Sequence, residues 1–476
     1  MSDLGDLHRL TAGEQAAALR RGEVSARELA EHYLARIREH NPAVGAFVTV
    51  TDEAALAAAD AADRALRRGG DGLPPLLGVP TAVKDLNLTA GVRTTLGSQV
   101  YADFVPTFDD YVVARLAAAG TVSLGKTNTP EFGLPCYTEP DVAPPARTPW
   151  DLGRSAGGSS GGAGAAVAAG LVPLAHGSDG AGSVRIPASV CGLVGLKPAR
   201  GRISGGPVYG DVAGLVCNGV LARTVADAAL LLDAMAGPEP GDPIWAPPLP
   251  AGQTFAASCR EPPGPLRIGR YRAPVIAEAS VHEECVTAYE TMTSVLGDLG
   301  HVVVDIDPPF GAEHVPAFET VWSVGATRVP VADRDVRRLR PLTRWLRERG
   351  FAVTAAAYSD ALTGLRLAAA AGIRANAEFD AVLTPTLAGL PAALGGLRND
   401  ADPQADFEAQ KRFTPFTAPY NLSGQPAISL PVHWTAEGLP VGVQLVGRPA
   451  DEATLLRLAA QVEEARPWAD RHPPLW

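Results

Sequence analysis

Two runs rich in glycine and serine constrain this chain of 476 residues more strongly than any other feature. The first is GGSSGG at residues 157–162, and the second is GSDGAGS at residues 177–183. Between them lies a stretch dominated by alanine, glycine and valine, which we expect to form a helix. Glycine at this density lets the backbone approach a ligand or another backbone closely. Serines among free backbone amides can provide a nucleophile beside an oxyanion hole, so the two runs predict a serine amidohydrolase site.

Composition is that of an ordinary globular protein, with 46% hydrophobic and 20% charged residues. The formal net charge of −11 argues against a surface that binds nucleic acid or anionic lipid, so we expect neither nucleic acid nor membrane as a partner. The most apolar run, residues 163–175, is broken by glycines and Pro173 and is too short to span a bilayer. The N-terminus has no basic flank followed by an apolar segment, which predicts a cytoplasmic protein.

The five cysteines are widely spaced and form no CxxC pair, which is typical of free thiols in a reducing compartment. The nine histidines stand apart from one another, and no spacing typical of metal ligands occurs. We therefore expect neither a metal nor a cofactor.

Helical and extended patterns alternate along the chain, which predicts an α/β core. Thr11 with Glu14 and Ser25 with Glu28 form capping boxes that mark two helix starts. Further helices are expected at 52–68, 111–119, 162–169, 224–236 and 451–464, and strands at 77–85, 121–125, 172–175, 266–269, 379–385 and 439–446. We interpret residues 1–476 as one domain and the proline-rich stretch at 238–265 as a surface connection, with an interdomain linker as the alternative.

Two familiar motifs match the chain but lack the context that each requires. Residues 120–127 fit the phosphate-loop pattern GxxxxGK[ST], but a helix is expected before them and Pro130 blocks a helix after them. Residues 153–157 and 157–161 fit GxSxG, the nucleophile elbow of α/β-hydrolases. No apolar strand leads into that motif, and His433 is a downstream histidine that no local pattern singles out. Both interpretations are disfavoured.

Lys84 lies in a strand-like run beside Ala82, Val83 and Leu86, where burial is expected. A buried ammonium group either pairs with a carboxylate or loses its proton. A neutral lysine can act as a general base that activates a serine. The alternative is a salt-bridged lysine with the adjacent Asp85 as its partner, and the sequence alone leaves both open.

Around these residues the chain resembles the amidase signature family. The block at residues 155–198 has the layout of the family hallmark, which is GGSSGG, a helix of small residues and then Gly-x-Asp-x-x-Gly-Ser-x-Arg. Flanking segments at 78–85, 125–133 and 421–426 also agree with the family pattern. The resemblance covers most of the chain and is thinnest between about 238 and 375, where members of the family vary.

The resemblance implies a single α/β/α sandwich around a mixed, twisted β-sheet. Its expected parts are a helical N-terminal part at 1–70, a signature core at 71–237, a variable specificity region at 238–375 and the C-terminal part of the core at 376–476. It also implies a Ser-Ser-Lys catalytic triad. Ser183 matches the nucleophile, Ser159 the bridging serine that follows a cis peptide bond in this family, and Lys84 the base.

The same resemblance assigns roles around the nucleophile. Its expected oxyanion hole consists of the backbone amides of Gly180, Ala181, Gly182 and Ser183. Asp179 and Arg185 are expected to hold the loop in shape rather than to react. Many members have Asp-Thr-Gly-Gly-Ser here, so the methyl group of Ala181 is a departure that restricts its backbone. We expect Ser178 to be a turn residue and His176 to be a packed core histidine.

The implied activity is hydrolysis of a small-molecule carboxamide, linear or cyclic, to a carboxylate and ammonia or an amine. One alternative is a glutaminase of the amidotransferase A type that works with a partner, and another is a catalytically silent binding protein. Residues 214–220 (GLVCNGV) stand where the glutamyl-tRNA amidotransferase of this type is expected to have a Ser-Ser-Leu-Asp-Gln-like segment. This difference favours a stand-alone amidase, and the complete triad argues against a silent protein.

Substrate contacts are expected in the turn at 131–137, with Gly133 and Leu134 as candidates. Three aromatic residues of the variable region, Phe318, Trp322 and Trp345, are candidates for a pocket wall or for core packing. No heptad pattern marks an interface, and a homodimer is one arrangement that the sequence leaves open.

Overall fold

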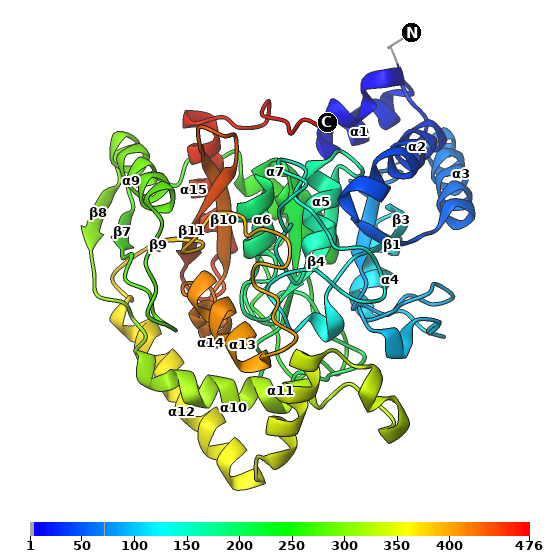
Figure 1. Ribbon diagram of the computed structural model, residues 1–476. Coiled ribbons are helices and arrows are strands. Elements are labelled where there is room, and N and C mark those ends of the chain that lie inside the picture. Colours follow the sequence, from blue (N-terminus) through cyan, green and yellow to red (C-terminus); the bar gives the residue numbers. More distant parts are fainter. Residues whose placement is uncertain (1–3, 71) are drawn as a thin grey trace.

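An eight-stranded sheet forms the centre of the molecule in the computed structural model, which describes residues 4–70 and 72–476 (Figure 1). Its strands lie in the order β4 (Leu174–Asp179), β6 (Cys217–Ala222), β5 (Val194–Lys197), β10 (Ala427–Trp434), β11 (Pro440–Gly447), β9 (Ala381–Pro385), β7 (Arg267–Arg270) and β8 (Val302–Asp305). Neighbours are antiparallel from β4 to β9, whereas β7 is parallel to both β9 and β8. The predicted mixed sheet is confirmed.

A smaller sheet, which the sequence analysis did not separate from the main one, carries the predicted base. It has the order β1 (Phe47–Val50), β3 (Val122–Thr127) and β2 (Pro80–Lys84). β3 is antiparallel to β1 and parallel to β2. β2 is buried at every residue and packs beside β4 of the large sheet. The end of β2 therefore comes close to the second glycine run.

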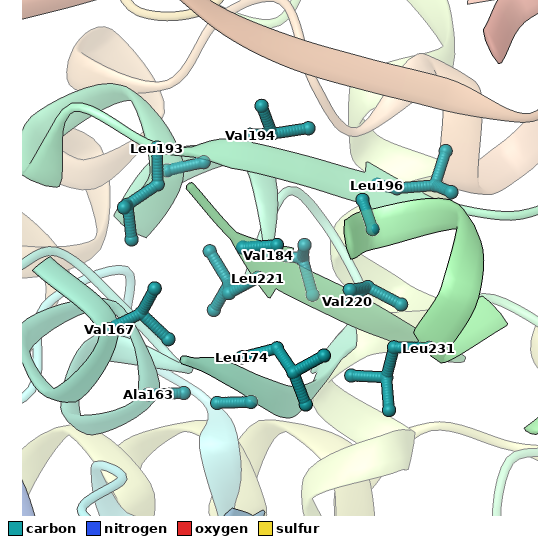
Figure 2. Packing of buried hydrophobic residues seen from close by; sticks show 14 of the residues in the cluster. Ala163, Val167, Leu174, Val184, Leu193, Val194, Leu196, Val220, Leu221 and Leu231 are labelled. Carbon is teal, nitrogen blue, oxygen red and sulfur yellow. The ribbon is translucent and has the colours of Figure 1, made fainter. Parts of the chain in front are cut away.

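Helices cover the large sheet in two groups. One group consists of α5 (Gly161–Ala168) and α6 (Arg185–Cys191), which pack on each other, and the other of α7 (Val225–Met235), α9 (Glu283–Asp298) and α15 (Glu452–Ala465). Figure 2 shows apolar side chains of α5, β4, β5, β6 and α7 meeting in the core between them. A β-carbon on Gly162 would collide with the backbone of Asn128, so the close packing of α5 requires its small residues.

The N-terminal helices are α1 (Ala12–Arg21), α2 (Ala26–Val44) and α3 (Asp52–Arg68). Both predicted capping boxes are formed, at Thr11 with Glu14 and at Ser25 with Glu28. The remaining helices are α4 (Tyr111–Ala118), α8 (Phe255–Ser258), α10 (Val315–Ala326), α11 (Pro341–Ala352), α12 (Ala355–Ala375), α13 (Pro403–Phe413) and α14 (Pro419–Ser423). The 3-10 helices are η1 (Leu4–Arg9), η2 (Gln99–Tyr101), η3 (Glu131–Gly133), η4 (Ala312–His314) and η5 (Asp333–Arg338). Helices α10 to α13 gather at one end of the molecule, near the bottom of Figure 1.

Most of the expected helices and strands occur within a few residues of their predicted ranges, but two details in and just before the second glycine run are wrong. The strand expected at 172–175 begins only at Leu174, because Pro173 has no N–H to donate to a neighbouring strand. It then continues to Asp179, which pairs with Cys217 of β6. Ser178 is consequently a strand residue and not the predicted turn residue.

The structure also lacks the local context that the two disfavoured motifs need. The phosphate-loop match ends inside β3, and the chain then enters a short 3-10 turn at η3 instead of a helix of the length required. Residues 149–152, ahead of the first GxSxG match, lie mostly in turns and not in a strand. Within residues 4–70 and 72–476, no helix has both the length and the apolar character needed to cross a membrane.

Candidate active site

Lys84, at the end of β2, has a fully buried side chain. Its Nζ donates hydrogen bonds to Oγ of Ser159 at 2.7 Å and to the carbonyl oxygen of Ser178 at 3.0 Å. Burial lowers the pKa of Lys84 to about 7, although the charge of Asp179 opposes this shift. A lysine in this setting can hold and release a proton near neutral pH.

The alternative pairing of Lys84 with Asp85 is wrong. β2 ends at Lys84, and Asp85 begins the turn that follows the strand. Asp85 accepts a hydrogen bond from the backbone N–H of Thr95 at 2.9 Å. Burial raises the pKa of Asp85 to about 6, and Lys126 is the first of the charges that oppose this rise.

Ser159 lies in the turn that leads into α5 and follows a cis peptide bond from Gly158, as the family resemblance implied. Its hydroxyl accepts the hydrogen bond from Lys84, and its carbonyl oxygen accepts one from Oγ1 of Thr129 at 3.0 Å. A β-carbon on Gly158 would lie 2.6 Å from the backbone nitrogen of Tyr137. The position before Ser159 therefore has no room for a side chain.

Ser183 lies between the end of β4 and the start of α6. Its carbonyl oxygen accepts the backbone N–H of Ser160 at 3.1 Å, which joins the two glycine runs. The residue is 6% exposed, and it lines a cavity. Lys84 from β2, Ser159 from the first run and Ser183 from the second are thus held in one largely buried region.

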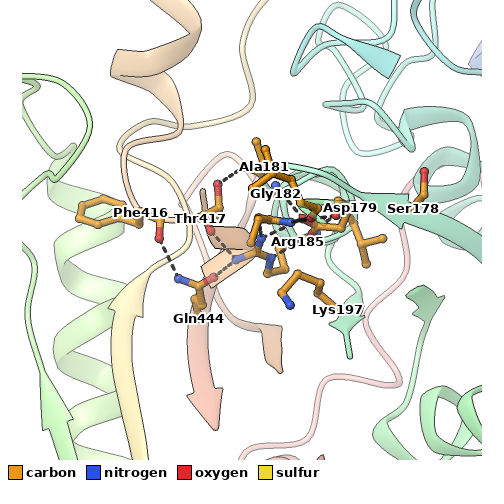
Figure 3. Close-up of polar contacts among 12 residues, drawn as sticks. Ser178, Asp179, Ala181, Gly182, Arg185, Lys197, Phe416, Thr417 and Gln444 are labelled. Carbon is orange, nitrogen blue, oxygen red and sulfur yellow. Dashed lines mark hydrogen bonds and ion pairs between the residues drawn. The ribbon is translucent and has the colours of Figure 1, made fainter. Parts of the chain in front are cut away.

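Asp179 and Arg185 form a fully buried ion pair under the loop of Ser183 (Figure 3). Nη2 of Arg185 lies 2.8 Å from Oδ1 of Asp179, and Nε lies 3.0 Å from Oδ2. Burial by itself would raise the pKa of Asp179, but the charge and hydrogen bonds of Arg185 hold that pKa below its usual range. Arg185 also donates to the Thr417 carbonyl at 2.9 Å, to Gln444 Oε1 at 2.5 Å and to Asn421 Oδ1 at 2.6 Å.

The Asp179 carboxylate also accepts a hydrogen bond from one amide of the predicted oxyanion hole. Oδ1 of Asp179 accepts the backbone N–H of Gly182 at 2.7 Å, so this amide is already engaged. The remaining candidate donors of the predicted oxyanion hole are the amides of Gly180, Ala181 and Ser183. Ala181 lies outside the left-handed backbone region, so its methyl group is accommodated without strain.

A largely apolar cavity opens beside Ser183, between the loop of Ser183 and the helices α10 and α13. Leu134, Phe318 and Trp322 line it, and the rings of Phe318 and Trp322 stack with their centroids 5.7 Å apart. Trp345 stands behind the wall, with its ring centroid 5.7 Å from that of the lining residue Phe407.

Comparison with known proteins places this architecture in a family. The family model described as Amidase matches residues 28–456. The chain belongs to the amidase family. It is 38% identical over 494 aligned positions to the 6-aminohexanoate-cyclic-dimer hydrolase of Paenarthrobacter ureafaciens, and the alignment covers 98% of this chain and 96% of that protein.

Two further similarities bear on the kind of amidase. A solved structure of 6-aminohexanoate cyclic dimer hydrolase complexed with substrate superposes with a TM-score of 0.91 at 37% identity, covering 98% of this chain and 99% of that one. An acylamidase of Rhodococcus erythropolis is 36% identical over 483 positions, covering 98% of both chains. This protein is accordingly a hydrolase of carbon–nitrogen bonds in amides.

The two histidines considered in the sequence do not line the cavity at Ser183. His176 is fully buried, accepts the backbone N–H of Lys84 on Nδ1 at 3.3 Å and contacts Asn218 through Nε2 at 3.0 Å. Burial lowers the pKa of His176 to about 3, so the ring stays neutral, as expected of a packed core histidine. His433 lies on β10 and pairs with Glu284 at 2.5 Å, away from the residues that line the cavity at Ser183.

Several cavity residues of the amidase escaped the sequence analysis. Glu319, Gln410 and Lys411 all line the cavity, and none belongs to a recognisable motif, whereas Cys136, which also lines it, lies in the predicted turn at 131–137. Gly133 was a candidate for substrate contact, but it does not line the cavity, and a β-carbon on Gly133 would lie 3.3 Å from Ser159 Oγ.

Proposed function

We propose that this amidase hydrolyses a small-molecule carboxamide through an acyl-enzyme on Ser183, with Ser159 as the bridging serine and Lys84 as the base. The observation that carries the proposal is the 2.7 Å hydrogen bond from Lys84 Nζ to Ser159 Oγ. It occurs where burial lowers the pKa of the lysine to about 7. A catalytic base is most effective when its pKa is near the working pH.

In the proposed reaction, neutral Lys84 accepts the hydroxyl proton of Ser159 while Ser159 accepts the proton of Ser183. The freed Oγ of Ser183 bonds to the amide carbonyl carbon, and the resulting oxyanion accepts hydrogen bonds from the amides of Gly180, Ala181 and Ser183. The proton then returns from Lys84 through Ser159 to the leaving nitrogen as the C–N bond breaks. Water attacks the acyl-enzyme by the same relay and releases the carboxylate.

The proposed substrate is a linear or cyclic amide, and the products are a carboxylate and ammonia or an amine. The apolar wall formed by Leu134, Phe318 and Trp322 supports an apolar portion in that substrate. Similarity to a hydrolase named for a cyclic amide supports the inclusion of cyclic substrates. Cytoplasmic location, a homodimeric state and the division of the chain into parts stay predictions.

Activity without a partner separates a stand-alone amidase from a component of an amidotransferase. The purified chain is incubated with hexanamide, an anilide, the 6-aminohexanoate cyclic dimer and glutamine, and product release is followed by mass spectrometry. We expect turnover of at least one non-glutamine amide, loss of that turnover in Ser183→Ala, and no change in Ser280→Ala, which alters an exposed serine. Release of ammonia from glutamine alone, and only after a partner is added, would overturn the stand-alone assignment.

A further inference from the structure

A cluster of four charged residues interrupts the apolar wall of the cavity at Ser183. Glu319 of α10 and Lys411 of α13 both line this cavity, and Lys411 Nζ lies 2.6 Å from Glu319 Oε1. The side chains are only 17% and 14% exposed, respectively. The two residues are 92 positions apart in the sequence, so packing of α10, α11 and α13 brings them together.

Each member of this pair has a second partner nearer to solvent. Nη2 of Arg349, on α11, lies 3.2 Å from Oε2 of Glu319, and Oε1 of Glu408, on α13, lies 2.6 Å from Nζ of Lys411. The cluster therefore contains two carboxylates and two cations, and its net charge is zero. Neither lining charge is left without a counter-charge.

This arrangement has a consequence for any group that enters the cavity. A charged group must give up its water, and burial of a charge is costly unless an opposite charge receives it. Glu319 and Lys411 neutralise each other, so an incoming ammonium or carboxylate group finds no vacant counter-ion on this wall. An uncharged, apolar group incurs no such cost and gains from burial against Leu134, Phe318 and Trp322.

We propose that Glu319 and Lys411 are specificity-determining residues, which restrict the cavity at Ser183 to uncharged and largely apolar parts of an amide substrate. The inference rests on the proposed function, because it takes Ser183 as the reacting group. The inference also predicts that substitution of Glu319 and substitution of Lys411 shift the preference between positively and negatively charged groups in opposite directions. Lys411→Met leaves the cluster with a net charge of −1, and Glu319→Gln leaves it at +1, whereas the double variant returns it to zero.

The test measures how fast Ser183 is labelled by three fluorophosphonates that share a six-carbon chain and end in a methyl, an ammonium or a carboxylate group. The wild type is expected to react at least tenfold faster with the methyl probe than with either charged probe. Lys411→Met should raise the ammonium-to-carboxylate rate ratio about tenfold, and Glu319→Gln should lower it about tenfold. Each substitution leaves one uncompensated charge on a partly buried wall, and this charge attracts one probe and repels the other. The double variant should restore the wild-type ratio.

Two further variants keep the test decisive. Glu408→Gln removes a carboxylate that is 38% exposed and should shift the ratio in the same direction as Glu319→Gln, even if the more buried substitution impairs folding. Glu290→Gln breaks a pair with Arg270 that lies outside the cavity lining and should leave the ratio unchanged.

The outcomes distinguish failure of this inference from failure of the proposed function. Labelling of Ser183 with ratios that move less than threefold, or in the same direction for Lys411→Met and Glu319→Gln, overturns the specificity role alone. No labelling of Ser183 by any probe in the wild type overturns the proposed function and this inference with it.

Discussion

Replacing Asp179 by asparagine tests whether the buried ion pair supports the loop of Ser183. The substitution keeps the shape of the side chain but removes the charge that faces Arg185, and neither side chain of this pair has any exposure. Loss of one partner from a buried pair leaves an uncompensated charge, which costs about 3–5 kcal/mol. The Asp179 carboxylate also accepts the N–H groups of Gly182 and Val184, one on each oxygen, and an asparagine side chain can accept only one of them. We therefore expect the free energy of unfolding to fall by about 3–5 kcal/mol.

The assay is urea denaturation followed by both circular dichroism and tryptophan fluorescence. The matched control is Asp60→Asn, which breaks a pair with Arg27 at 2.9 Å whose side chains are 40% and 44% exposed. Exposed pairs of this kind contribute about 0–1 kcal/mol, so the control should lose far less stability. Equal losses in Asp179→Asn and Asp60→Asn would refute the assignment of Asp179 and Arg185 as the support of the loop.

Two further predictions concern the proton path and the space around it. The rate constant kcat/KM should rise with pH with a midpoint near 7, because Lys84 must lose its proton to act as a base and burial lowers its pKa to about 7; a flat profile between about pH 5.5 and 8.5 would contradict this role. Gly133→Ala should reduce kcat/KM at least about tenfold, because φ at this position is +69° and the new β-carbon would lie 2.6 Å from Leu86 Cδ1 and 3.3 Å from Ser159 Oγ. Gly91→Ala is the control, since φ there is +72° with open space around it, and equal effects of the two substitutions on kcat/KM would show that backbone strain alone explains the loss.

Structural features that depend only on neighbouring residues could be predicted from the sequence. The capping boxes at Thr11 and Ser25 need only neighbouring residues, and both helices begin where predicted. The helix of small residues between the glycine runs also formed, as α5.

Structural features that depend on contacts between distant segments could not be predicted from the sequence. Whether residues 177–179 form a loop or a strand depends on β6, which supplies their antiparallel partners. Strands β5, β6, β8 and β10 gave no decisive local pattern, and their place became clear only in the assembled sheet. The cavity wall shows the same limit, because Glu319 and Lys411 belong to helices that meet only through tertiary packing. Residues for the predicted triad could be named because they match the family pattern, whereas the cavity lies partly in the region where the resemblance is thinnest.

The most direct test of the central claim is intact-mass spectrometry after exposure to a serine-directed fluorophosphonate. We expect a single adduct on the wild type, no adduct on Ser183→Ala and much slower labelling of Lys84→Ala. An adduct that persists in Ser183→Ala but disappears in Ser159→Ala would contradict the assignment of Ser183 as the nucleophile.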